Sequence, residues 1–184
     1  FEDQVINLST FLEVGEVVKS ISEKYQDTVQ WSFKPHPQLK TNLYNHPDWG
    51  KSRTDIYYSY WEASSYTQLD DGDYVDLFKE SDAILHDCGS FILDYLCTRK
   101  VCAYIEINSE NQLRSINSFG LDALNCYERI RSSEDLESFV KKVAENQLTI
   151  NSHYIDFYEK NFTAFYGEKK PSELILKLIK DEFI

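Results

Sequence analysis

The feature that most constrains the fold is the run from Asp82 to Ile107, in which two short apolar segments flank an amphipathic one. Ala83 to Leu85 are apolar and too few for a helix, and a polar Asp-Cys-Gly-Ser turn follows at 87–90. Apolar residues then recur at helical spacing from Phe91 to Leu96, and Val101 to Ile107 reads as another strand. A strand, turn, helix and strand in so short a run predict a parallel crossover unit.

The region before this unit predicts a helix, a strand and a stiff loop. Leu8 to Tyr25 has apolar residues at helical spacing, and Val29 to Phe33 has strand character. The strand must stop at Lys34-Pro35-His36-Pro37, because proline cannot continue the ladder. We also expect a helix over Asp55 to Ser64 and a short strand over Tyr66 to Leu69.

The rest of the chain predicts helices. Asp73 is suited to cap a helix that runs to about Ser81. After Ile107 we expect only helices: Ser133 to Glu145 with Ser133 as its cap, a weaker one over Ser152 to Phe162, and a last one over Ser172 to Phe183. Pro171 favours the start of that last helix, since proline suits the first helical position.

These elements predict an α/β fold, with a Rossmann-like parallel sheet and helices on both faces. The length of 184 residues fits a single domain, residues 1–184, with a C-terminal helical extension over 146–184. Hydrophobic residues make up 42% of the chain, which is enough for a core. The chain begins at Phe1 and contains no methionine. We therefore expect a fragment of a longer protein, or a sequence that has lost modified methionines.

Charge and cysteine usage exclude several classes of function. The net charge is −12 and no basic run exceeds a pair, so a nucleic-acid-binding face is not expected. No stretch reaches the roughly 20 apolar residues of a membrane span, and no signal peptide is visible. The four cysteines lack metal-ligand spacing, which favours reduced, mostly buried thiols in a cytosolic protein without a metal site.

Polar residues follow two of the predicted strands, at the ends where open α/β sheets bind ligands. Lys34 and His36 follow the first strand, and the turn with Asp87, Gly89 and Ser90 follows the later one and opens a helix. A helix N-terminus offers unpaired N–H groups and a partial positive charge, which favours phosphate. Gly89 would allow close approach, Ser90 would add a donor, and Asp87 would order the turn by accepting its N–H groups. Together these residues predict a diphosphate cradle.

Simpler interpretations stand beside this one. The turn can be a plain helix cap, His36 a loop histidine held by its prolines, and Asp94 a solvated or capping carboxylate. The aromatic cluster over Tyr57 to Trp61 can be core packing rather than a platform for a base.

The combination of motifs resembles the carboxyl-terminal half of the CDP-glycerol glycerophosphotransferases, which make teichoic-acid-like polymers. That family shows a Lys/Arg-x-His-Pro strand end and then a Ser-Asp-x-x-x-Thr-Asp-Tyr-Ser-Ser-x-x-x-Asp-Tyr block. The block is matched here by Ser81, Asp82, Asp87, Ser90, Asp94 and Tyr95. The resemblance covers Leu8 to Ile107, and Gly167 to Ile179 more loosely. His86, Cys88 and Gly89 depart from the block, which puts the identity of the donor in question.

The resemblance implies one half of a GT-B-like transferase, at the inner face of a bacterial membrane, that moves glycerol phosphate or a related alcohol phosphate from a CDP donor to a polymer or lipid-linked acceptor. It implies donor binding by Lys34, His36, Asp87, Gly89, Ser90 and Asp94, without a further cofactor. The general base, and any peripheral membrane contact, would belong to the missing amino-terminal half. The alternatives are a UDP-sugar glycosyltransferase or epimerase-like domain and a non-catalytic nucleotide-binding module.

Overall fold

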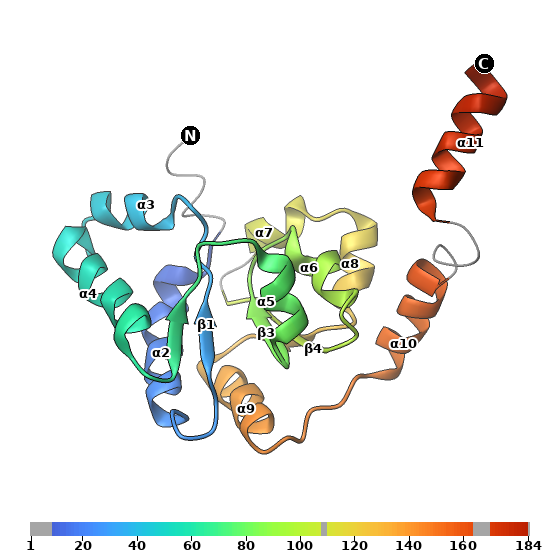
Figure 1. Ribbon diagram of the computed structural model, residues 1–184. Helices are drawn as coiled ribbons and strands as arrows, with labels where there is room; N and C mark the ends of the chain where they lie inside the picture. Colours follow the sequence, from blue (N-terminus) through green and yellow to red (C-terminus); the bar gives the residue numbers. More distant parts are fainter. Residues whose placement is uncertain (1–8, 108–109, 164–169, 184) are drawn as a thin grey trace.

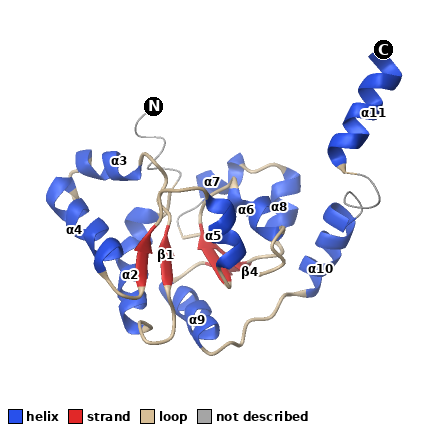
Figure 2. Ribbon diagram, in the orientation of Figure 1, coloured by secondary structure: helices blue, strands red, loops and turns tan. Residues whose placement is uncertain are grey.

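The computed structural model describes residues 9–107, 110–163 and 170–183 and has an α/β fold with two parallel sheets (Figures 1 and 2). The strands are β1 (Trp31–Phe33), β2 (Thr67–Leu69), β3 (Ala83–His86), β4 (Val101–Ile105) and β5 (Glu128–Ile130). β1 pairs with β2, and the second sheet has the order β3–β4–β5. In Figure 1 the two sheets lie beside each other, with β1 next to β3.

Helices account for most of the remaining described residues. They are α2 (Phe11–Lys24), α3 (Leu39–Asn45), α4 (Gly50–Ala63), α5 (Tyr74–Glu80), α6 (Phe91–Leu96), α7 (Glu110–Ser115), α8 (Ser118–Leu124), α9 (Ser133–Ala144), α10 (Ser152–Tyr158) and α11 (Pro171–Phe183). A short π-helical segment, η1 (Glu159–Thr163), continues α10. No helix among the described residues is long and apolar enough to cross a membrane.

The predicted crossover unit is confirmed as β3, α6 and β4. The apolar run at 83–86 is the strand β3, the polar turn at 87–90 leads into α6, and the chain returns as β4 in parallel with β3. Lys100, just before β4, donates to the carbonyl oxygens of Phe78 at 3.2 Å and of Lys79 at the end of α5. A cation at a helix C-terminus satisfies carbonyls that have no partner within the helix, so Lys100 fastens α5 to the crossover.

The three-stranded sheet is covered on both faces, because side chains alternate along its central strand β4. Cys102 and Tyr104 point into a core with residues of α6, α8 and α10. Ala103 and Ile105 point into a second core with residues of α2 and α9. Two-sided burial explains why β4 reads as a continuous apolar run, as expected of a parallel strand between two helical layers.

A third, mostly aromatic core lies beside β1 and β2. Its buried members come from α2, α3 and α4, and they are Phe11, Leu43, Trp49, Tyr57, Tyr58 and Trp61. Trp61 is 1% exposed and its ring packs against Trp31 and Phe33 of β1. Three of the four aromatic residues predicted at 57–61 are therefore buried in the core, as the packing interpretation requires.

Several sequence predictions are wrong in detail. The chain after Ile107 is not only helical, because β5 forms there with a single partner strand. The cap of α9 is Ser132 rather than Ser133, since the Ser132 side chain accepts from the N–H of Asp135. The helix expected over 55–64 begins at Gly50, and α3 was not predicted. Leu8, the first residue of a predicted helix, lies outside the described residues. So do residues 167–169 of the segment that loosely resembles the glycerophosphotransferases.

The C-terminal region divides into a packed part and a projecting part. α10 buries Tyr154 and Phe157 in the core beside α6. α11 extends away from the rest of the chain in Figure 1. Its large apolar side chains are exposed; they are Leu174, Ile175, Leu176, Leu178 and Ile179. The expected helical extension therefore begins with a helix that belongs to the main core.

Candidate functional site

The start of α2 contacts the ends of both strands that carry the predicted site. The ring of Phe11 lies 6.4 Å from that of Phe33, the last residue of β1. The N–H and hydroxyl of Thr10 donate to the carboxylate of Asp87, the first residue after β3, at 2.6 and 3.0 Å. The N-terminus of α2 thus contacts both the end of β1 and the end of β3, which are far apart in the sequence.

Asp87 orders the start of α2 instead of its own turn. Besides Thr10, the hydroxyl of Ser9 donates to the same carboxylate oxygen at 3.1 Å. The N–H of Cys88 donates to Nδ1 of His86 and not to Asp87. A carboxylate at a helix N-terminus is favourable, because it satisfies unpaired N–H groups and meets the positive end of the helix dipole. The expectation that Asp87 accepts N–H groups of its turn is therefore corrected.

Replacing Asp87 with alanine should lower the free energy of unfolding by about 2 kcal/mol, because Thr10 would lose a charge-assisted acceptor while only 2% exposed. Urea unfolding of the two proteins measures the difference. Asp94→Ala is the control, since Asp94 is an exposed carboxylate that accepts a single bond from Tyr74. Equal effects of the two substitutions would show that the contact between Asp87 and α2 contributes nothing specific.

The turn before α6 has open donors. Within the described residues the backbone N–H groups of Gly89 and Ser90 have no acceptor, and both residues are exposed. The Ser90 hydroxyl lies 3.1 Å from the sulfur of Cys88. A Cβ placed on Gly89 would meet nothing within 4 Å, so space is open in front of this backbone.

Lys34 and His36 have local partners. The ammonium of Lys34 lies 3.0 Å from the Asp70 carboxylate and also donates to the carbonyl oxygen of Gly72, which ties the end of β1 to the end of β2. The positive charge of Lys34 is thus already matched by a carboxylate. His36 is exposed, and its Nδ1 accepts from the N–H of Gln38 at 3.2 Å.

His86 is buried beneath the turn. Its ring packs against Phe91, Tyr104 and Tyr127, and Nδ1 accepts from Cys88 at 3.1 Å. The proton of the neutral ring therefore lies on Nε2. Burial lowers the pKa of His86 from its ordinary 6.5 to about 4, although Asp87 acts in the opposite direction. A neutral, buried imidazole fits a structural role better than that of a general base.

Two arginines near this turn were missed by the sequence reading, because β5 was not predicted. Glu106 follows β4, and its side chain is only 6% exposed. It pairs with Arg129 of β5 and lies 3.0 Å from Nε of Arg131. Arg129 is the register partner of Tyr104, which is the partner of His86. The only available sequence signal was Arg-x-Arg after the helix that ends at Leu124.

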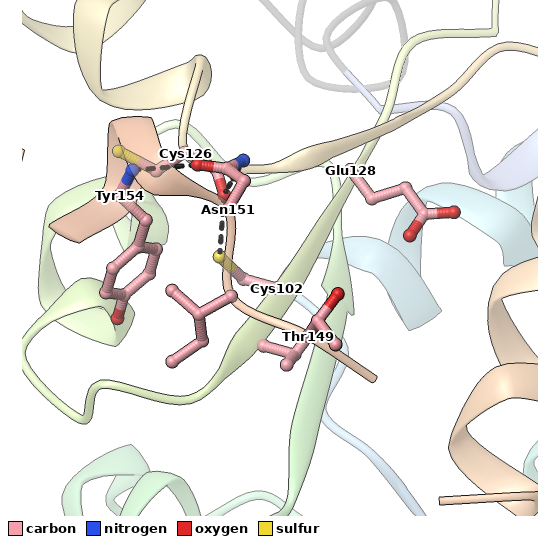
Figure 3. Close-up of a pocket in the computed structure, with 8 residues that line it drawn as sticks. Cys102, Cys126, Glu128, Thr149, Asn151 and Tyr154 are labelled. Atoms are coloured by element: carbon pink, nitrogen blue, oxygen red, sulfur yellow. Dashed lines mark hydrogen bonds between the residues drawn. The ribbon is translucent and has the colours of Figure 1, made fainter. Parts of the chain in front are cut away.

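A cavity lies at the opposite ends of the strands, where β4 and β5 begin. It measures about 260 Å³ and is lined by Cys102, Cys126, Glu128, Asn151 and Tyr154, among others (Figure 3). The Asn151 amide reaches the carbonyl of Cys126, and the Tyr154 hydroxyl donates to Leu96. Burial raises the pKa of the Cys102 thiol, and that of Cys126 to about 12, so both thiols stay neutral.

This cavity holds none of the predicted site residues. Within the described residues, no group of histidine, cysteine and carboxylate side chains could hold a metal ion. All four cysteines are free thiols. The candidate ligand-binding site is therefore the open turn at 88–90 together with the groups on the neighbouring strand ends. No protein-family model matches this chain, and no curated protein or solved structure matches it either.

Proposed function

We propose that the chain is the donor-nucleotide-binding part of a transferase that moves glycerol phosphate, or a related alcohol phosphate, from a CDP donor. The observation that carries the proposal is the open turn at 88–90, with unpaired donors after the parallel strand β3. Ligands of open α/β sheets bind at such strand ends. The sequence resemblance to the glycerophosphotransferases supplies the donor class and a polymer or lipid-linked acceptor.

We further propose that the two sheets act as one Rossmann-like layer in the order β2–β1–β3–β4–β5. Trp31 of β1 and Leu85 of β3 pack against the same apolar cluster, which supports this order. The order of the strands reverses between β1 and β3 in such a sheet, and this switch point is where a nucleotide is expected. The contacts from the start of α2 to Phe33 and Asp87 lie at the same place.

The proposal places binding here and leaves proton transfer from the acceptor to another part of the enzyme. His86 is buried and held by Cys88. His36 and His46 accept from backbone N–H groups two residues onward, and His153 lies 3.4 Å from the Asp122 carboxylate. His86 is the imidazole next to the turn at 88–90 in the sequence, and it is buried, while the exposed His36 is assigned to donor binding. The chain should therefore bind a donor without turning it over.

Titration calorimetry with CDP, CDP-glycerol and UDP-glucose tests the proposal. We expect weak binding of the two cytidine nucleotides, because only one side of a cleft is present and a ligand needs most of its surface buried for high affinity. Gly89→Val should lower the affinity by about tenfold, since its side chain would fill the space that a phosphate needs. Incubation with CDP-glycerol and a lipid-linked acceptor should release no CMP.

The matched control is Gly72→Val, in the turn between β2 and α5, where a Cβ would have only a side-chain oxygen at 3.8 Å. This variant should keep the affinity of the unmodified chain. Preference for UDP-glucose would favour the glycosyltransferase alternative. Absence of binding for every nucleotide, or equal binding by Gly89→Val, would refute the proposed site.

A further inference from the structure

We propose that Arg129 and Arg131, rather than Lys34, supply the positive charge of the diphosphate site. This inference rests on the proposed function and deepens it. It requires that the two guanidinium groups lie on the same face as the turn before α6, that they keep unused donors, and that their charge exceeds that of their carboxylate partner.

The register of the sheet places the arginines beside the turn. His86, Tyr104 and Arg129 lie side by side on β3, β4 and β5. Neighbouring strands are about 4.8 Å apart, so the Cα atoms of His86 and Arg129 are about 10 Å apart. Register partners on parallel strands point to the same face, and the His86 ring on that face contacts Phe91, the first residue of α6.

Glu106 holds both arginines at this edge. Its buried carboxylate pairs with Nη2 of Arg129 through one oxygen and with Nε of Arg131 through the other. Its N–H donates to the carbonyl oxygen of Ile130 at 2.7 Å, which extends the pairing of β4 and β5 past their ends. A carboxylate so fixed fastens the two guanidinium groups in place, and preorganised donors are what charge recognition requires.

The cluster retains donors and has more guanidinium groups than carboxylates that pair with them. An arginine has five N–H donors, and the carboxylate of Glu106 engages few of the ten in this pair. Within the described residues Nε of Arg129 is buried without an acceptor, and the Arg131 side chain is 70% exposed. Two guanidinium groups share the single carboxylate of Glu106, and the Asp135 carboxylate accepts, among the described residues, only from the backbone N–H of Arg131.

The ligand chemistry that fits is a phosphate or diphosphate. Planar guanidinium groups bind phosphate oxygens through two parallel N–H bonds, which an ammonium group cannot do. Lys34 is a poorer candidate, because Asp70 already pairs with it at 3.0 Å. Arg131, which is exposed and next to the strand end, would reach the outer phosphate, while Arg129 would hold the inner one.

Calorimetric titrations of the chain with inorganic pyrophosphate and with CDP, in low-salt buffer, test this assignment. We expect Arg131→Ala to weaken the binding of both by about tenfold or more, and Arg131→Lys to restore only part of the loss. Arg53→Ala removes an equal charge from an arginine that also pairs with a glutamate, on α4, and should leave both affinities within about twofold. Urea unfolding of each variant reports its stability separately.

Three possible results distinguish failure of the arginine assignment from failure of the proposed function. If the unmodified chain binds both ligands and Arg131→Ala binds them equally well, the arginine assignment is wrong and the proposed function stands. If pyrophosphate binds in an Arg131-dependent manner and no nucleotide binds, the anion site stands and the proposed function fails. If neither ligand binds the unmodified chain, both fail.

Discussion

Replacing Trp61 with alanine is expected to lower the free energy of unfolding by about 3–5 kcal/mol, the range for removing a buried tryptophan. Trp61 is 1% exposed at the centre of the aromatic core, with ring centroids of Phe33 and Tyr60 at 5.1 and 5.2 Å. Its removal leaves a cavity that β1 and α4 cannot close without losing those contacts. Urea or thermal unfolding measures the loss.

The control is Ile56→Ala on the same helix, where the side chain is 69% exposed. That change should stay within about 0.5 kcal/mol, as for surface substitutions in general. The comparison also bears on the choice between core packing and a base-stacking platform at 57–61. A stability loss below about 1 kcal/mol for Trp61→Ala, accompanied by a loss of nucleotide affinity, would favour the platform.

Acid is expected to destabilise the protein through His86. Burial lowers the pKa of this imidazole to about 4 in the folded chain, whereas in the unfolded chain it keeps its ordinary value of 6.5. Between these values the unfolded state binds the proton and the folded state does not. The contribution of His86 to the free energy of unfolding is therefore fully present above pH 6.5 and is lost as the pH falls toward 4. At pH 5 the loss amounts to about 2 kcal/mol.

His86→Asn isolates this contribution. The asparagine oxygen can take the place of Nδ1 as the acceptor of the Cys88 N–H, and it does not titrate in this range. We expect the difference in unfolding free energy between pH 7 and pH 5 to shrink by about 2 kcal/mol in this variant. His36→Asn is the matched control, because His36 accepts from an N–H two residues onward in the same way but is exposed. Identical pH profiles of all three proteins would contradict the prediction.

The parts of the fold that could be predicted are those fixed by local pattern. The crossover from β3 to β4 was predictable because its apolar runs and polar turn are contiguous. Asp73 was predictable as a cap because the bond to Val75 is local. β5 could not be predicted, since it has three residues, two of which are charged, and its strand conformation depends on pairing with β4.

In the candidate site, too, local features were predictable from the sequence and long-range contacts were not. The turn at 88–90 was found from sequence because a glycine and a serine between a strand and a helix form a local signal. The partner of Lys34 is 36 positions away and the partner of Asp87 is 77 positions away, so neither pairing leaves a local signal. Arg129 was missed together with its strand. Long-range partners therefore decided which charges remain free for a ligand.

The contact between Asp87 and the start of α2 also bears on the order of folding. It closes a separation of 77 residues, whereas the β3–α6–β4 crossover needs only neighbouring segments. Closing a long loop lowers the entropy of the chain before the contact that it forms can stabilise the fold. Contacts between neighbouring segments therefore form first. We infer that the three-stranded sheet assembles early and that α2, with β1, docks afterwards. The Asp87→Ala variant should therefore unfold faster while folding at nearly the same rate.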